Sequence, residues 1–258
     1  MTKKLQNIIN KLSPIAALLV VVMLWAAATG FSWVPAFMLP SPRAVLDAFV
    51  TDFPLLLQHA GVTLCEAFAG LSIGVLLAFV LAALMNRFAF LYKALYPVLV
   101  ITQTIPTIAI APLLVLWMGF GMAPKITLVV ITTFFPIAVS LLDGFRSADA
   151  DAVNLLRSMG AGRLKIFRHV LMPSALGSFF AGLKVSASYA VVGAVISEWL
   201  GGFEGLGVYM TRVQKAYAFD KMFSVILFIT LISLLLMWGV TLLRYLVMPW
   251  ERKEKERK

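Results

Sequence analysis

Long apolar runs alternate with short polar stretches along the whole chain. Six such runs lie at about 14–34, 62–85, 95–119, 125–145, 175–200 and 223–248. Each run has close to the roughly 20 residues that an α-helix needs to cross the hydrocarbon core of a bilayer. Because backbone groups inside a bilayer find no water to bond, these runs are expected to be helical. The pattern therefore predicts an all-α membrane protein with six transmembrane helices.

Positive charges between the runs predict the orientation of the chain, because lysine and arginine gather on the cytoplasmic side of membrane proteins. One side of the six predicted spans holds Lys3, Lys4, Lys11, Arg87, Lys93, Arg146, Arg157, Arg163, Lys165, Arg168 and the tail 250–258. The other side holds Arg43, Lys125, Arg212, Lys215 and Lys221. This asymmetry predicts that both termini face the cytoplasm.

The composition agrees with a membrane protein and excludes several kinds of chemistry. Hydrophobic residues make up 61% of the 258 residues and charged residues 13%. The single cysteine, Cys65, has no second cysteine to pair with, and two distant histidines are too few for a metal cluster. We therefore expect no metal and no cofactor. The formal net charge of +10 suggests nucleic acid only in a soluble protein; here it lies mostly between or beyond the apolar runs.

The first apolar run has two interpretations. Lysines precede it and the small residues of "WAAAT" follow, as in a cleaved signal peptide. Five further spans come after it, which favours an uncleaved first span. We then expect one transmembrane domain over 1–258, with the core at about 62–248, an extra N-terminal span at 14–34 and a basic cytoplasmic tail at 250–258. Such a tail is expected to be drawn to anionic membrane lipid.

Prolines mark two features of the predicted bundle. Ser41 and Pro42 suit the N-cap and first position of an interfacial helix on the outer side. The third run carries Pro97, Pro106 and Pro112, which kink or break a helix. Breaks within a membrane survive only where protein or a water-filled cavity covers the freed backbone groups. The third span is therefore expected to border a path through the bundle.

A hydrophilic stretch at 149–173 interrupts the apolar pattern between the fourth and fifth spans. Asp149 or Asp151 can cap a short helix that ends near Met159. The following Gly160 and Gly162 permit a turn that residues with a Cβ resist. The stretch is therefore expected to begin with a helix and a tight turn.

A second helix is expected after this turn. Leu164, Phe167 and Leu171 share one of its faces, and Pro173 is expected to end it. A DNA-binding helix-turn-helix would have the same outline, but a loop held at the membrane by both ends could hardly enter a major groove. A plain positive-inside loop needs neither the glycines nor the apolar stripe. A unit that transmits force from a cytoplasmic partner explains both, and no nucleic-acid partner is expected.

The same stretch resembles the cytoplasmic loop of binding-protein-dependent ABC transporter permeases, with the pattern E-A-A, three residues, G, nine residues, I-x-L-P. The matching positions are Asn154, Leu155 and Leu156 for the triplet, Gly160 for the glycine, and Val170, Met172 and Pro173 for I, L and P. The spacing matches completely, whereas the triplet lacks its glutamate. In this family the loop is a coupling helix that docks on a cytoplasmic ATPase. The resemblance implies that role for Asn154, Leu155, Leu156, Arg157, Ser158, Met159, Gly160, Ala161, Gly162, Val170, Met172 and Pro173.

Other segments extend the resemblance over nearly the whole chain. "LPSP", "IPTIAIAPLLVLWMGFG", "FFPIAVSLLDGFR" and "GAVISEWLGGFEGLG" look like the subgroup for nitrate, sulfonate, taurine and thiamine-pyrimidine uptake. The resemblance implies the permease of an ATP-driven importer in the bacterial inner membrane, assembled as a homodimer with two ATPase subunits and an extracytoplasmic binding protein. "SYAVVGAVISEW" looks closer to the branch for thiamine's pyrimidine precursor. Sulfonate, taurine, nitrate and riboflavin stay open as cargo.

Four residues are candidates for the translocation path. Glu198 is an acid at the outer end of the fifth span, where it either lines the path or is solvated at the interface. Gln103 and Thr104 precede Pro106 and either face a cavity made by the kink or bond a neighbouring helix.

The chain has none of the patterns of an enzyme. It lacks the G-x-x-x-x-G-K-[ST] loop that cradles ATP phosphates, and no nucleophile and base converge in its spans. A separate subunit must therefore hydrolyse ATP. A channel-like or scaffold protein without ATP coupling is the alternative from another class.

Overall fold

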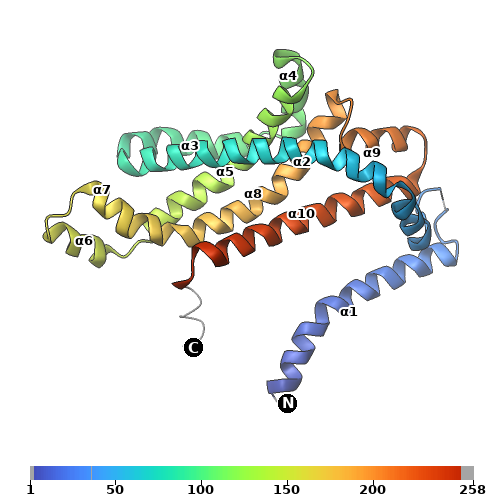
Figure 1. Ribbon diagram of the computed structural model, residues 1–258, viewed down its shortest axis with the longest axis horizontal. Helices are drawn as coiled ribbons and strands as arrows, with labels where there is room; N and C mark the ends of the chain where they lie inside the picture. The colour runs from blue at the N-terminus through green and yellow to red at the C-terminus, as the bar shows by residue number, and fades with distance from the viewer. Residues whose placement is uncertain (1–2, 36, 251–258) are drawn as a thin grey trace. The chain divides into compact units, whose positions relative to one another are not determined.

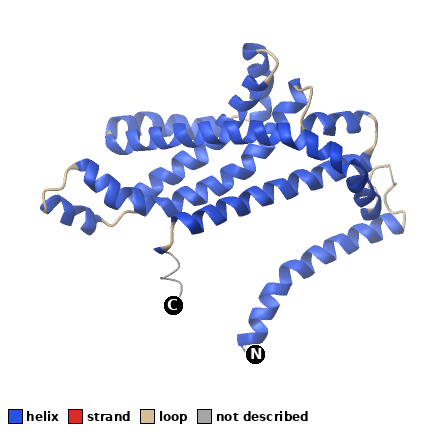
Figure 2. Ribbon diagram, in the orientation of Figure 1, coloured by secondary structure: helices blue, strands red, loops and turns tan. Residues whose placement is uncertain are grey.

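The computed structural model describes residues 3–35 and 37–250, with the backbone alone for residues 3–11. It consists of helices joined by short loops, and the described part contains no strand (Figure 2). The predicted all-α class is confirmed. The basic tail expected after residue 250 lies outside the described residues.

The helices follow one another along the chain with few long connections (Figure 1). They are α1 (Lys3–Gly30), α2 (Pro42–Arg87), α3 (Ala89–Thr104), α4 (Thr107–Met118), α5 (Met122–Arg146), α6 (Ala150–Ser158), α7 (Arg163–Ile166), the π-helical turn η1 (Phe167–Leu171), α8 (Met172–Gly201), α9 (Leu206–Lys215) and α10 (Phe219–Val247).

Five stretches of helix are long and apolar enough to cross a membrane: Leu12–Gly30, Pro42–Arg87, Met122–Arg146, Arg163–Gly201 and Phe219–Val247. α3 and α4 form a sixth candidate, bent by 99° at the break between them. Counted as one broken span, this pair completes the six predicted spans.

The helix predicted at the membrane interface after Ser41 is not a separate element. Ser41 Oγ accepts a hydrogen bond from the Ala44 amide at 3.2 Å, as an N-cap should. From Pro42 the helix then continues to Arg87 as one element of 46 residues, with Pro54 inside it. The predicted interfacial stretch and the second span are therefore one continuous helix, and the interfacial position of its first part stays a prediction.

The chain forms two compact units. One comprises Met1–Gln58 and Tyr209–Phe228, and the other His59–Val208 and Ile229–Lys258. In the first unit, Tyr209 donates a hydrogen bond to Asp52, and Lys221 Nζ lies 2.9 Å from the same carboxylate. Burial and the Asp52 carboxylate raise the pKa of the Tyr209 phenol, so it stays protonated and donates. These contacts tie α9 and the start of α10 to α2.

The core of the second unit lies where α5 and α8 run side by side (Figure 1). Small residues allow their backbones to approach closely. A Cβ on Gly144 would lie 2.7 Å from Ala175 Cα, and one on Gly182 would lie 2.7 Å from the Pro136 carbonyl oxygen. Close approach of this kind is the main source of helix association in membranes. The buried residues around it are Ala78, Ala82, Met85, Leu99, Ile137, Ala138, Leu141, Leu142, Phe145, Ala175, Phe180, Leu183 and Met248.

Candidate functional site

The stretch 149–173 begins as predicted, with a capped helix and a tight turn. Asp149 Oδ1 accepts a hydrogen bond of 2.9 Å from the Asp151 amide and caps α6. The helix ends before Met159, and Gly160 turns the chain with a φ of +78°. Gly162 has a φ of −65° in extended backbone, so it does not need the freedom of glycine.

α6 carries two different faces. Leu155 and Met159 are one helical turn apart and are 62% and 73% exposed. Val153 and Arg157, also one turn apart, line a cavity against the second unit's bundle. Because 100° separates successive residues, these two pairs lie on nearly opposite sides of the helix. α6 therefore presents an exposed apolar face on one side and a cavity wall on the other.

The second helix of the stretch differs from the prediction at Pro173. That proline does not end the helix, because α7, η1 and α8 form one helical run from Arg163 to Gly201. η1 is a π-helical turn in which the Met172 amide bonds to the Phe167 carbonyl, five residues back. Proline has no amide hydrogen, and its ring clashes with the carbonyl four residues before it in a regular helix. A wider turn just before the proline relieves that clash.

The apolar face of this run is also shifted from the prediction. Ile166 is buried, Phe167 packs on Phe145 with 5.4 Å between ring centroids, and Leu171 contacts the core. Leu164 is instead 79% exposed. The anchoring residues are therefore Ile166, Phe167 and Leu171.

The structure places the twelve predicted coupling residues in one contiguous segment, from α6 to the start of α8. Exposed positions are Asn154, Leu155, Arg157, Ser158, Met159, Gly160, Gly162 and Pro173, and half-buried positions are Leu156, Ala161, Val170 and Met172. The exposed ones cluster in α6 and the turn. Their contact with an ATPase stays a prediction.

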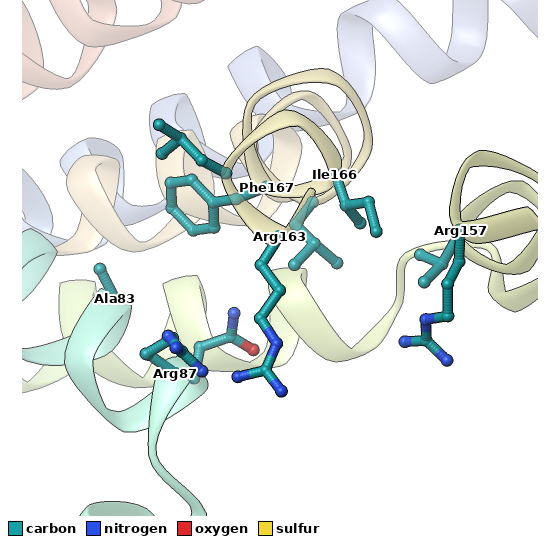
Figure 3. Close-up of a pocket in the computed structure, with 10 residues that line it drawn as sticks. Ala83, Arg87, Arg157, Arg163, Ile166 and Phe167 are labelled. Carbon is teal, nitrogen blue, oxygen red and sulfur yellow. The ribbon is translucent and has the colours of Figure 1, made fainter. Parts of the chain in front are cut away.

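Three arginines border a cavity of about 580 Å³ beside this segment (Figure 3). Arg87 ends α2, Arg157 lies in the last turn of α6, and Arg163 begins α7. We call this space the arginine cavity. Its complete lining is Ala83, Asn86, Arg87, Val153, Arg157, Arg163, Leu164, Ile166, Phe167 and Leu171.

Glu198 lies at the opposite end of α8 from this segment and is buried, with 1% of its surface exposed. Its Oε1 accepts a hydrogen bond of 2.7 Å from Thr63 Oγ1, and its Oε2 accepts one of 2.6 Å from the Gly207 amide. Burial of a carboxylate is tolerated when its oxygens are satisfied in this way. Of the two interpretations of Glu198, solvation at the interface is wrong for this structure; its place in a path is untested.

The loop after α8 is held by the same neighbourhood. The Gly205 amide donates to His59 Nδ1 at 3.1 Å, and the Leu206 amide donates to Thr63 Oγ1 at 2.9 Å. Gly205 has a φ of +124°, and a Cβ there would meet the Glu198 carboxylate. Hydrogen bonds to His59, Thr63 and Glu198 therefore hold residues 205–207 against α2 and the end of α8.

A second buried acid lies in the same region. Glu66 in α2 is fully buried, and its Oε1 lies 2.7 Å from Lys125 Nζ in α5. Lys125 is also buried, although the charge pattern placed it in an outer loop. Both line a cavity of about 450 Å³ with Gly61, Val62, Cys65, Gly121, Met122, Gly201, Phe203 and Glu204. We call His59, Thr63, Glu66, Lys125 and Glu198 the glutamate cluster.

The predicted break at Pro106 is confirmed, whereas Pro97 and Pro112 lie inside α3 and α4 without breaking them. Gln103, just before this break, lines a cavity of about 250 Å³ with Thr107, Thr132, Tyr189, Val192, Gly193 and Ile196. Thr104 and Glu198 are not part of its lining, and the Thr104 hydroxyl bonds back to the Ile101 carbonyl at 2.8 Å. We call this space the glutamine cavity.

Sequence reasoning missed most partners in these sites. Glu66 carried a usable signal, because an acid within an apolar run is costly and needs a partner. The sequence gives no comparable signal for Tyr189 and Thr132, because polar side chains of this size are common in transmembrane helices.

Comparison with known proteins identifies the family. The family described as "Binding-protein-dependent transport system inner membrane component" matches residues 70–252. The chain belongs to this family. A probable ABC transporter permease protein of Haemophilus influenzae is 37% identical over 232 residues, which cover 90% of this chain and 95% of that protein. The formylaminopyrimidine transport permease protein ThiX of Halalkalibacterium halodurans is 33% identical over 244 residues, with coverage of 94% and 97%.

Further relatives differ in the solutes that their names give. A riboflavin permease is 32% identical, and taurine, aliphatic-sulfonate and nitrate permeases are 25–27% identical. Among solved structures, an inward-facing MetNI methionine ABC transporter aligns with a TM-score of 0.68 at 19% identity, over 76% of this chain and 98% of that chain. That likeness supports the permease fold. The chain is a membrane-spanning permease subunit of an ABC importer and not an enzyme.

Proposed function

We propose that this permease imports the pyrimidine precursor of thiamine, as a homodimer with two cytoplasmic ATPase subunits and an extracytoplasmic binding protein. Both termini and the segment 149–173 face the cytoplasm, in keeping with the positive-inside bias. The observation that carries the proposal is the continuous helix from Arg163 to Gly201, which connects that segment to the interior of the bundle.

The continuous helix supports a mechanism of alternating access. We place the ATPase on α6 and its following turn, where Leu155 and Met159 expose an apolar face. Closure of the ATPases on ATP would move this segment together with α7, and the helical run would carry the movement into α8. Val192, Gly193 and Ile196 of α8 line the glutamine cavity. A shift of α8 therefore changes a cavity within the bundle, and hydrolysis would reset it.

The chemistry of the glutamine cavity supports an uncharged cargo. An amide, two threonine hydroxyls and a phenol line it, and none of its described lining residues is charged. These groups donate and accept hydrogen bonds, and the Tyr189 ring offers an aromatic face. A pyrimidine with amino and hydroxymethyl groups matches them, whereas a sulfonate or nitrate would need a compensating positive charge.

The test compares growth phenotypes of the gene deletion. In a thiamine-synthesis mutant on limiting hydroxymethylpyrimidine, we expect growth to require this gene. Growth on taurine or an alkanesulfonate as the sole sulfur source should not require it. Dependence only in the sulfur assay would overturn the pyrimidine assignment.

A second measurement tests the ATP-coupled class. An affinity-tagged permease should co-purify with a nucleotide-binding subunit in about equimolar amounts. A permease that transports its solute without any such subunit would instead be the channel-like alternative, and a scaffold would show neither behaviour.

A further inference from the structure

Arg87, Arg157 and Arg163 come from three separate helices and meet at one cavity. In Figure 3, Arg163 lies between Arg87 and Arg157 in that view, and all three line the same cavity. All three are exposed. Three positive charges that line one cavity attract an anion.

Among the described residues, no acidic side chain supplies that anion. Within the described residues, the ion pairs join Arg43 to Asp47, Lys125 to Glu66 and Lys221 to Asp52, and none involves the three arginines. Asp149 and Asp151 are the acids nearest to them in sequence, and the Asp149 carboxylate accepts a hydrogen bond from the Asp151 amide. Of the three arginines, only Arg87 has a described cation–π contact, with its guanidinium 5.3 Å from the centroid of the Phe88 ring. Within the part of the chain that the structure describes, the cavity therefore has positive charge without a matching negative group.

Apart from Asn86, the other residues that line the cavity are apolar. Ala83 belongs to the last turns of α2, and Ile166, Phe167 and Leu171 belong to the run that anchors the segment in the core. A ligand that fills about 580 Å³ here must therefore combine an anionic group with apolar surface. Arginine forks bind phosphate oxygens in a bidentate manner. Basic pockets between transmembrane helices at the cytoplasmic side are known to bind phospholipid headgroups.

We infer that the arginine cavity binds the phosphate of an anionic phospholipid. The three guanidinium groups hold the phosphate, and an acyl chain runs along Ala83, Phe167 and Leu171. The lipid ties the membrane-facing side of α6 to the end of α2. The inference goes beyond the proposed transport function. It rests on that proposal only in placing the cavity at the cytoplasmic leaflet of the membrane.

An acidic side chain of the ATPase is the competing occupant, and the two faces of α6 argue against it. Leu155 and Met159 are exposed and lie outside the cavity lining, so they remain free for a protein partner. Arg157 lies on the other side of the helix, together with the cavity. A lipid in the cavity and an ATPase on the exposed face can therefore bind at the same time.

The experiment measures lipid binding to the full-length permease purified alone in neutral detergent. The probe is phosphatidylglycerol with a fluorescent acyl chain, displaced by unlabelled phosphatidylglycerol, phosphatidylcholine or inorganic phosphate. We expect phosphatidylglycerol to bind at least about tenfold more tightly than phosphatidylcholine, since each basic residue adds to the attraction. Inorganic phosphate at equal concentration should displace little, because it lacks the acyl chain.

Two triple variants that remove the same number of positive charges distinguish binding in the arginine cavity from general attraction of lipid to the basic surface. The site variant carries Arg87→Gln, Arg157→Gln and Arg163→Gln. The control carries Lys93→Gln, Lys165→Gln and Arg168→Gln, which are exposed residues outside the cavity lining. The site variant should lose at least about tenfold more phosphatidylglycerol affinity than the control. The single variant Arg87→Gln lies outside the segment 149–173, and it should show a smaller loss in the same direction even if the triple variant folds poorly.

Three results would overturn the inference. Equal losses in the site and control variants would show that only diffuse surface charge attracts lipid. Displacement by inorganic phosphate as effective as that by phosphatidylglycerol would assign the cavity to a free anion. Unchanged lipid binding in the site variant, with loss of the co-purified ATPase, would assign the arginines to the protein partner. None of these depends on the cargo, so the transport proposal stands or falls separately.

Discussion

Thr63 donates a hydrogen bond of 2.7 Å to Glu198, a residue 135 positions further along the chain. The same Thr63 hydroxyl accepts from the Leu206 amide, and Glu198 accepts from the Gly207 amide. The two side chains thus connect α2, the end of α8 and the start of α9 in one buried network. Such a network stabilises a single position of the loop between α8 and α9, because each member leaves a buried group unpaired when it is removed.

The first prediction concerns the acid of this network. Glu198→Ala should lower the free energy of unfolding by about 2–4 kcal/mol, because it leaves the buried Gly207 amide without an acceptor and leaves the Thr63 hydroxyl only the more distant His59 carbonyl, at 3.3 Å. Thermal unfolding of the detergent-purified protein, followed by tryptophan fluorescence, measures the change. Glu204→Gln is the control, since Glu204 is exposed on the same loop. A Glu198→Ala protein as stable as this control would mean that the network contributes nothing.

The second prediction concerns the buried ion pair of Glu66 and Lys125. Glu66→Gln or Lys125→Met alone should destabilise by about 3–5 kcal/mol, because each leaves a buried charge unpaired. The double variant should recover much of that loss, since it removes both charges. A double-mutant cycle of unfolding temperatures measures the coupling. If the double variant lost as much stability as the two single variants added together, the pair would not be a coupled unit.

The third prediction concerns the turn after α6. Gly160→Val places a β-branched residue at a φ of +78°, where no neighbouring atom lies within 4 Å of the added Cβ. The variant should therefore insert normally but misplace α6, with loss of ATPase binding and of transport-stimulated ATP hydrolysis. Gly162→Ala is the matched control, because its φ of −65° suits any residue and its surroundings are open. Normal uptake by Gly160→Val would remove the coupling role from this segment.

These sites show which features can be read from one sequence. The Asp149 cap, the Gly160 turn and the Pro106 break depend on a few adjacent residues, and the sequence predicts each of them as one of two or three candidates. The effect of Pro173 was predicted wrongly, because a proline ends a helix or not depending on whether the turn before it can widen. The π-helical turn at Phe167–Leu171 is supported by packing on the core, which a local pattern does not contain.

The partners of the buried charges could not be predicted for a different reason. Glu66 and Lys125 are 59 residues apart, and only the packing of α2 against α5 brings them together. A single sequence marks a charge within an apolar run as costly but does not name its partner. The arginine cavity is a similar case, since its three arginines come from helices that meet only in the folded chain.

The fourth prediction tests the orientation. Single cysteines at positions 158 and 43, in a Cys65→Ser background, should react from opposite sides of the membrane. Arg43 is preferable to its neighbour Ser41, because Ser41 caps α2 whereas the Arg43 side chain is 92% exposed. An impermeant maleimide added to intact spheroplasts should label only position 43, and permeabilised cells should show labelling of both. Labelling of position 158 from outside would reverse the proposed topology.

The last prediction concerns cargo contact in the glutamine cavity. Gln103→Leu keeps the side-chain size but removes the amide of a residue that lines this cavity, so it should lower uptake of hydroxymethylpyrimidine by about tenfold, the effect of losing one hydrogen bond. Thr104→Val is the matched control, because Thr104 is adjacent in α3, is outside the cavity lining and spends its hydroxyl on the Ile101 carbonyl. Initial uptake rates of labelled pyrimidine with saturating binding protein measure both variants, and equal expression in membranes makes the rates comparable. A selective loss in Gln103→Leu, with normal ATPase co-purification, would place the cargo beside the break between α3 and α4. Equal rates in the two variants would remove Gln103 from the path.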